Sequence, residues 1–274
     1  MASEKKEQPV FGTSGLRGLA AALTDTVCGR HVQAFLLLQE PAPAGLLIGR
    51  DLRASSPRIA AAVTRAALSI GVRVWDCGPL PTPALALAAA ESGLPAVMIT
   101  GSHIPAERNG LKFLTAAGDI GKKEEARIAH LAAELPDTAA VSGATGLERD
   151  VVAPYRDRLV RFFGAGALKG CRIGIFQHSS VARDLLVDLV SALGAEADPF
   201  GRTDQFLPLD TEAVEDTLRR DLARRAADGG YDAVLSTDPD ADRPLMVDDK
   251  GRLVAGDSLA LLAARALGAE AIVT

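Results

Sequence analysis

The 274-residue chain carries 30 Lys and Arg against 35 Asp and Glu, a formal net charge of −5, with no basic cluster. This balance argues against nucleic acid or an anionic membrane as a partner. Hydrophobic residues make up 48% and charged residues 24%, as in a globular protein of about two domains. The charged N-terminus lacks the apolar stretch of a signal peptide, and the three cysteines form no C-x-x-C pair. We therefore expect reduced thiols and a cytoplasmic location.

Strands alternate with helices along the first half of the chain. A buried strand is predicted over 45–48, and a Ser-Ser-Pro cap at 55–57 begins a helix over 59–70. The predicted elements then continue with a strand at 72–75, a helix at 83–92, a strand at 95–100 and a helix at 122–135. This alternation predicts a mostly parallel sheet with helices on both faces.

A segment rich in Pro, Ser, Thr, Gly and Ala over 136–146 interrupts the pattern and predicts a domain boundary. The elements predicted beyond it are a helix at 151–163, a strand at 171–176, helices at 182–193 and 211–227, a strand at 232–236, a helix at 257–267 and a strand at 271–274. We predict an α/β fold of tandem domains, 1–148 and 149–252, each with a mostly parallel or mixed sheet flanked by helices. Residues 253–274 would begin a third domain, and we expect a truncated fragment.

The segment T-G-S-H-I-P at 100–105 follows a predicted buried strand. Glycine at 101 permits an unusual backbone angle and a close approach by a ligand, and the Ser102 hydroxyl then lies at the mouth of the strand. An isolated Ser-His pair is most often a helix cap beside a surface histidine. A Ser-His hydrolase would need G-x-S-x-G, a pattern that does not occur around Ser102.

The segment D-P-D-A-D-R at 238–243 follows a second predicted strand. In extended backbone the carboxylates of Asp238, Asp240 and Asp242 share one face, and they repel one another unless a divalent cation neutralises them. Hard oxygen ligands suit Mg²⁺ or Ca²⁺. An EF-hand loop requires glycine where the chain has Arg243, whereas a solvated acidic turn stays open for this motif alone.

Two more segments carry arginines. The glycine-rich F-G-T-S-G-L-R-G at 11–18 is neither a P-loop nor a dinucleotide fingerprint, because its glycine spacing differs from both. The segment G-R-D-L-R at 49–53 follows a predicted strand and adds cationic donors. Each alone would be a tight turn or a surface charge cluster.

Taken together and in this order, the four segments resemble the α-D-phosphohexomutase family, which includes phosphoglucomutases and phosphomannomutases. The match runs from Phe11 onward: a glycine loop with arginine, G-R-D-x-R, the serine loop followed by N-G-x-K, and D-x-D-x-D-R. Ile104, where the family most often has Asn, is a feature that we associate with bacterial phosphomannomutases. The resemblance implies interconversion of hexose 6-phosphate and hexose 1-phosphate, of mannose or glucose, through a phosphoserine and a hexose 1,6-bisphosphate.

The resemblance also implies how the phosphoryl group is held. Ser102 would carry it, and Asp238, Asp240 and Asp242 would bind Mg²⁺ together with an oxygen of the phosphorylated Ser102. Phosphoryl transfer depends on positioning and on neutralising the charge of the transferred group, which suits this set of residues.

The remaining implied roles belong to cationic and amide side chains. Lys112 would act as the general acid and base, with His103 and Arg17 beside the phosphate as further catalytic residues. Arg17, Asn109 and Arg243 would contact the substrate, with Arg243 facing the reacting centre.

Family members have four domains, and their sugar-recognition and distal phosphate-binding loops have no counterpart before Thr274. We therefore expect the chain to bind Mg²⁺ with little or no mutase turnover. Two alternatives stay open. One is a metal-dependent sugar-phosphate phosphatase, in which water takes the phosphoryl group from Ser102. The other is a non-catalytic binding protein derived from a mutase, against which the complete set of Ser102, Lys112 and three aspartates argues.

Overall fold

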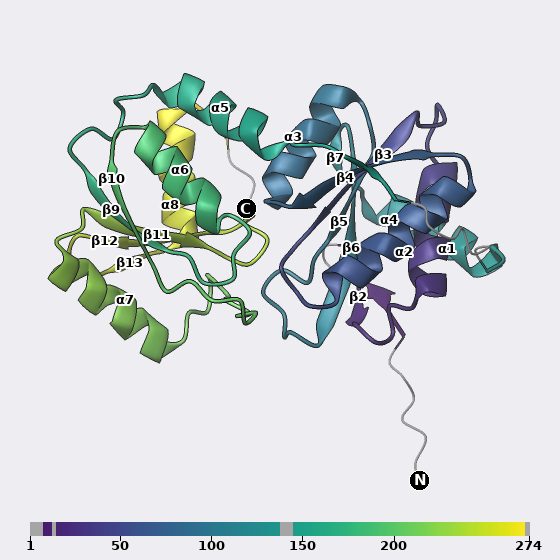
Figure 1. The fold of residues 1–274 in the computed structure, drawn as a ribbon, viewed down its shortest axis with the longest axis horizontal. Coiled ribbons are helices and arrows are strands. Elements are labelled where there is room, and N and C mark those ends of the chain that lie inside the picture. The colour runs from purple at the N-terminus through teal and green to yellow at the C-terminus, as the bar shows by residue number, and fades with distance from the viewer. Residues whose placement is uncertain (1–7, 13–14, 138–144, 272–274) are drawn as a thin grey trace, which may run out of the picture. The chain divides into compact units, whose positions relative to one another are not determined.

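The computed structural model describes residues 8–12, 15–137 and 145–271, and the chain divides into two units, Met1–Tyr155 and Arg156–Thr274 (Figure 1). Each unit contains one mixed β-sheet flanked by helices, which confirms the predicted fold class. The predicted domain limits at 148 and 252 stay predictions. Part of the predicted linker, residues 138–144, and the end of the last predicted strand, 272–274, lie outside the described residues. No helix of the described part has the length and apolar character needed to cross a bilayer.

The first unit confirms every strand and helix predicted between residues 45 and 135, within a few residues at each end. Its elements are β1 (Val10–Phe11), β2 (Leu16–Leu19), α1 (Asp25–Leu37), β3 (Gly45–Arg50), α2 (Ser56–Ser69), β4 (Arg73–Pro79), α3 (Thr82–Ser92), β5 (Ala96–Ile99), β6 (Arg108–Thr115), β7 (Gly118–Asp119), α4 (Lys122–Glu134), β8 (Leu147–Glu148) and the start of α5 (Val152–Phe163). No element was predicted at β1, β2, α1, β6, β7 or β8. The start of α1 does carry a signal, because the Thr24 side chain accepts a hydrogen bond from the Val27 N–H at 3.3 Å.

The sheet of the first unit has the strand order β1-β2-β6-β5-β3-β4-β8, with β7 paired to β6. Strand β3 pairs in parallel with both β4 and β5, whereas β6 runs antiparallel to β5 and β2. The expectation of a mostly parallel sheet is thus met only in the β5-β3-β4-β8 half. The antiparallel half arises because β5 returns directly into β6 through the serine loop, without a crossover helix.

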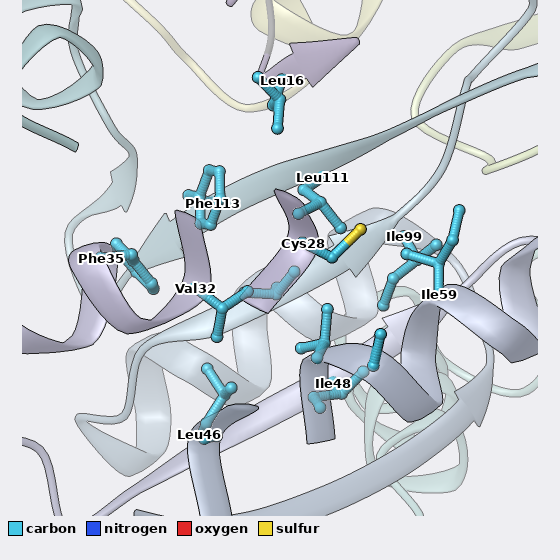
Figure 2. Packing of buried hydrophobic residues seen from close by; sticks show 14 of the residues in the cluster. Leu16, Cys28, Val32, Phe35, Leu46, Ile48, Ile59, Ile99, Leu111 and Phe113 are labelled. Atoms are coloured by element: carbon cyan, nitrogen blue, oxygen red, sulfur yellow. The ribbon is translucent and has the colours of Figure 1, made fainter. Parts of the chain in front are cut away.

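Both faces of this sheet are covered, as the continuous apolar strands require. Along β3, Leu46 and Ile48 lie in the cluster formed with α1, α2 and α4, whereas Leu47 packs on the opposite face with α3. Figure 2 shows the first of these clusters, in which Phe35 of α1 lies near Phe113 of β6 with 5.0 Å between ring centroids. Alternating side chains therefore anchor the sheet between two helical layers, and its strand ends are held in fixed register.

The second unit repeats this plan with fewer strands. Its elements are the rest of α5, then β9 (Arg172–Phe176), α6 (Arg183–Ala192), β10 (Glu196–Phe200), α7 (Asp216–Gly229), β11 (Ala233–Thr237), β12 (Pro244–Asp248), β13 (Leu253–Val254) and α8 (Gly256–Ala266). The sheet order is β10-β9-β11-β12-β13, with β9 parallel to β10 and β11. Ile175 packs on one face with α6, and Val234 packs on the other with α7. Strands β10 and β13 were not predicted, and α7 begins five residues later than predicted, at Asp216 rather than residue 211.

Candidate functional site

The serine loop and the G-R-D-L-R segment lie side by side because their strands are parallel neighbours. Strands β3 and β5 pair with Arg50 opposite Ile99, so the chain leaves both strands at the same edge of the sheet. The carboxyl edge of such a sheet is where ligands bind. Sequence reading had placed each segment after a strand, and the register explains why the two meet.

Ser102 occupies a backbone conformation that is unfavourable for a residue with a side chain. Its φ angle is +50°, in the left-handed region, and the residue is buried. The Ser102 N–H donates to Thr100 Oγ1 at 2.8 Å, which holds this angle. The Ser102 hydroxyl lies 3.2 Å from Nδ1 of His103, within hydrogen-bond reach of a group that can exchange a proton. The loop thus presents a serine oxygen next to an imidazole.

Lys112 and Arg17 lie on the antiparallel strands beside this loop. Lys112 is on β6 opposite Met98, with its ammonium 3.5 Å from the carboxylate of Asp119. Arg17 is on β2 opposite Gly110. A side chain at residue 110 would place its Cβ 2.6 Å from Cδ of Arg17 and 2.5 Å from the Leu16 carbonyl oxygen, so glycine is required for this packing. Thr13 and Ser14 of the predicted glycine loop lie outside the described residues.

Asn109 is fully buried. Its side-chain NH₂ group donates to the hydroxyls of Ser55 and Ser56 at 2.8 and 2.9 Å, and its side-chain oxygen, Oδ1, accepts from the Gly110 N–H at 2.8 Å. In this structure Asn109 joins β6 to the start of α2. The predicted contact of Asn109 with a substrate stays a prediction.

The acidic loop follows β11 in the second unit. One carboxylate oxygen from each of Asp238, Asp240 and Asp242 lies within 4.8 Å of the others, with the first two side chains buried and the third exposed. Oδ1 of Asp238 accepts the backbone N–H groups of Asp242 and Arg243, both at 3.1 Å, which closes the loop. Three oxygen ligands at this spacing fit a hard divalent cation, and the set contains no soft ligand. Arg243 pairs with Glu212 at 3.1 Å.

A segment that sequence reading did not single out, residues 177–181, supports the acidic loop. It follows β9, the parallel neighbour of β11. Nε2 of His178 lies 2.9 Å from the Thr237 carbonyl oxygen, Ser180 Oγ lies 2.7 Å from Thr237 Oγ1, and the Val181 N–H donates to the Pro239 oxygen at 3.0 Å. Only the strand pairing could reveal this, because the segment carries no motif.

His178 is held neutral. The Thr237 carbonyl oxygen can only accept a hydrogen bond, so Nε2 carries the ring proton and Nδ1 is unprotonated. Nδ1 is buried and has no hydrogen-bond partner among the described residues. Burial lowers the pKa of His178 from 6.5 to about 4, and the bond to the Thr237 carbonyl opposes this shift only in part.

Left-handed backbone outside glycine is confined to these loops in the part of the chain that the structure describes. The residues with positive φ are Ser102 at +50°, His178 at +28° and Ala241 at +58°. Each such residue costs about 1–3 kcal/mol and persists only where its surroundings impose it. Strain of this kind clusters at functional sites, and it occurs here in the two loops that carry motifs and in the segment 177–181 that supports the acidic loop.

The chain that carries these two strand-end loops is similar to phosphoglucomutases and phosphomannomutases. Residues 8–138 match the family model described as phosphoglucomutase/phosphomannomutase, alpha/beta/alpha domain I. The chain belongs to the α-D-phosphohexomutase family and resembles bacterial phosphomannomutases.

Two curated relatives and one solved structure show the extent of the similarity. A phosphomannomutase of Sinorhizobium fredii is 44% identical over 97% of this chain and 58% of its own length. A phosphomannomutase of Salmonella muenchen is 39% identical over 96% of this chain and 55% of its own length. The crystal structure of a putative phosphomannomutase from Thermus thermophilus shares the fold, with a TM-score of 0.79, 24% identity, and coverage of 95% of this chain and 62% of its own. The chain thus spans a little over half the length of the curated relatives.

Proposed function

We propose that the chain is the part of a hexose-phosphate mutase that takes up and returns the phosphoryl group, with Ser102 as its carrier. The observation that supports this most strongly is the strained, buried Ser102 with its hydroxyl 3.2 Å from the His103 imidazole. A serine in an ordinary helix cap needs no left-handed backbone angle. The substrates proposed are hexose 1-phosphate, hexose 6-phosphate and the 1,6-bisphosphate, of mannose or glucose.

In the proposed step, the Ser102 oxygen forms a bond to phosphorus while the bond between phosphorus and a sugar oxygen breaks. The hydroxyl proton leaves Ser102, and we propose that His103, whose Nδ1 lies 3.2 Å from the hydroxyl oxygen, accepts it. The sugar oxygen takes up a proton, for which we propose Lys112, whose ammonium carries three donors. Arg17 and Arg243 are proposed to bind the phosphate and sugar, as the family motif implies.

We propose that Asp238, Asp240 and Asp242 hold Mg²⁺. Their oxygens lie within 4.8 Å of one another, and hard oxygen ligands are those that Mg²⁺ prefers. When bound, the cation would neutralise negative charge on the transferred phosphoryl group. The bonds from Asp238 to the N–H groups of Asp242 and Arg243 keep the loop closed around the ligand oxygens.

Intact-mass spectrometry tests the carrier role. The 274-residue chain is incubated with Mg²⁺ and either mannose or glucose 1,6-bisphosphate, and Ser102→Ala serves as the matched control. We expect one added phosphate that maps to Ser102 and is missing from the variant. Steady loss of the bisphosphate to inorganic phosphate would instead indicate a phosphatase, and a chain that never gains phosphate would contradict the proposal.

Titration calorimetry with Mg²⁺ alone tests the metal site. Asp240→Asn keeps the size of the side chain and removes its charge, so we expect Mg²⁺ affinity to fall by at least about tenfold. Asp249→Asn, an exposed acidic residue beyond β12, is the control and should bind as the parent does. Equal affinity in parent and Asp240→Asn would exclude the loop as the metal site.

A further inference from the structure

Arg53 is a fully buried arginine whose guanidinium faces the serine loop. Its side chain has a relative exposure of 0%, although arginine is among the residues least often buried. All five of its N–H groups are used, with these acceptors: Asp51 Oδ2 at 3.1 Å, Ser102 O at 2.8 Å, Ile104 O at 2.6 Å, Pro105 O at 2.7 Å and Arg108 O at 3.1 Å. A guanidinium engaged in this way has no donor left for a substrate phosphate.

Asp51 holds the loop from the other side. One of its carboxylate oxygens, Oδ2, accepts the Thr100 hydroxyl at 2.9 Å and the Gly101 N–H at 3.2 Å, in addition to the Arg53 Nε–H. Thr100 Oγ1 in turn accepts the Ser102 N–H. The buried pair therefore holds both backbone polar groups of Ser102. Arg53 donates to the Ser102 carbonyl oxygen, and Asp51 holds the Thr100 hydroxyl that accepts the Ser102 N–H.

Gly101 leaves the space that Arg53 occupies. A Cβ at residue 101 would lie 2.6 Å from Cζ and 2.7 Å from Nε of Arg53, closer than real contacts allow. The φ angle of Gly101 is not in the left-handed region, so the requirement for glycine comes from the guanidinium and not from the backbone angle. The serine loop and Arg53 are thus fitted to each other.

We propose that Arg53, paired with Asp51, is the positioning residue of the serine loop. Its guanidinium holds four carbonyl oxygens and keeps Ser102 in the left-handed conformation that presents its hydroxyl. This inference rests on the proposed function for its catalytic consequence, because a misplacement of about 1 Å of a reacting group costs about a hundredfold in rate. Lysine cannot replace Arg53, since a single ammonium cannot span the same acceptors.

Two measurements on the 274-residue chain test the inference. In Arg53→Ala we expect faster amide hydrogen exchange in residues 100–108, with β3 and α2 still protected, and phosphorylation of Ser102 slowed about a hundredfold. Free guanidinium at millimolar concentration should restore both, because it fills the vacated site, whereas sodium at the same ionic strength should restore neither. A general loss of stability would not respond to guanidinium in this way.

Arg58→Ala is the matched control. Arg58 also donates to backbone carbonyls of the first unit, those of Ala20 and Leu23 at 2.9 and 3.0 Å, but it does not contact the serine loop. We expect parental exchange in residues 100–108 and parental phosphorylation. If Arg53→Ala fails to fold, Gly101→Ala displaces the guanidinium while retaining it, and it should loosen the same residues without rescue by guanidinium.

The outcomes separate this inference from the proposed function. Unchanged exchange in residues 100–108 of Arg53→Ala, or of Gly101→Ala, overturns the positioning role whatever happens to phosphorylation. A parent chain that takes up no phosphate contradicts the proposed function, and hydrogen exchange alone then decides whether Arg53 holds the loop. Slow phosphorylation with unchanged exchange would assign Arg53 to a direct role in the reaction and also overturns the inference.

Discussion

The serine loop of the first unit and the acidic loop of the second unit are each held by the segment that follows a neighbouring parallel strand, but different chemical groups hold them. Each follows a strand whose parallel neighbour ends at the same sheet edge, and each contains a residue with left-handed backbone. The segment after β3 holds the serine loop with the buried ion pair of Asp51 and Arg53. The segment after β9 holds the acidic loop with a neutral histidine, a serine hydroxyl and a backbone N–H.

The difference follows from what each loop carries. The serine loop offers carbonyl oxygens, and a cation such as Arg53 binds several of them at once. The acidic loop offers three carboxylates proposed as metal ligands, so a permanent cation among its supports would compete with the metal for them. Neutral donors can hold the backbone of this loop without that competition. Removing one support should therefore cost much more in the first unit than in the second.

The largest effect is expected from Asp51→Ala, which leaves Arg53 buried without its carboxylate. Removing one partner of a buried ion pair costs about 3–5 kcal/mol. Urea unfolding followed by fluorescence of Trp75, the one tryptophan of the chain and part of the first unit, measures the loss. Asp25→Ala removes an exposed carboxylate that pairs with Arg58 and Arg65, and it should cost at most about 1 kcal/mol. Similar losses in the two variants would contradict the comparison.

The second unit should lose stability on acidification through His178. Its pKa is about 4 in the folded chain against an ordinary 6.5, so the unfolded chain binds the proton more tightly. The stability is fully present above pH 6.5 and falls as the pH approaches 4, by up to about 3 kcal/mol. Hydrogen exchange of β9 and β11, corrected for the intrinsic pH dependence, measures it. His178→Gln keeps a hydrogen-bond donor and does not titrate, so its stability should not fall between pH 6.5 and 4 through this group. If the stability of the parent and of the variant falls equally with pH, His178 is not the source of the loss.

A smaller loss is expected from Ser180→Ala. Ser180 Oγ bonds to Thr237 Oγ1 and accepts the Ala182 N–H at 3.0 Å, and neutral bonds of this kind contribute about 1 kcal/mol each. Hydrogen exchange of β11 measures the loss, and Mg²⁺ titration should show weaker binding because the ligands are less well placed. Ser191→Ala, on the last turn of α6, is the control. A loss as large as that of Asp51→Ala would erase the contrast between the two units.

The smallest effects should come from relieving the strained angles. Ser102→Gly and Ala241→Gly are each expected to raise stability by up to about 1 kcal/mol, because glycine adopts left-handed angles freely but loses more chain entropy on folding. Trp75 fluorescence reports the first change, and hydrogen exchange of β11 reports the second. Ser102→Ala removes the hydroxyl and keeps the strain, so it should not stabilise the chain. If Ser102→Gly and Ser102→Ala were equally stable, the left-handed backbone of Ser102 would not be strained.

The motifs and their order could be predicted from the sequence because each depends only on residues that are close together along the chain. Glycine before Ser102, alternating aspartates after a strand and the regular exchange of strands with helices are properties of short segments. Strand β6 was not predicted because Asn109 and Gly110 have low β-propensity, although Leu111 and Phe113 alternate toward one sheet face as in a strand. Helix α1 was not predicted either, although Thr24 is a helix N-cap residue that can be recognised from the sequence.

The sequence by itself determined the α/β class, the family and the residues proposed for phosphoryl transfer, because periodicity and motif spacing are written along the chain. Only the tertiary structure decided which segments support those residues. Arg53 could have bound a phosphate as well as a loop, and 177–181 carries no motif, so their roles depended on which strands are parallel neighbours. Strand pairing joins segments that are far apart in the sequence, and the register then fixes which carbonyl oxygens a buried donor can reach.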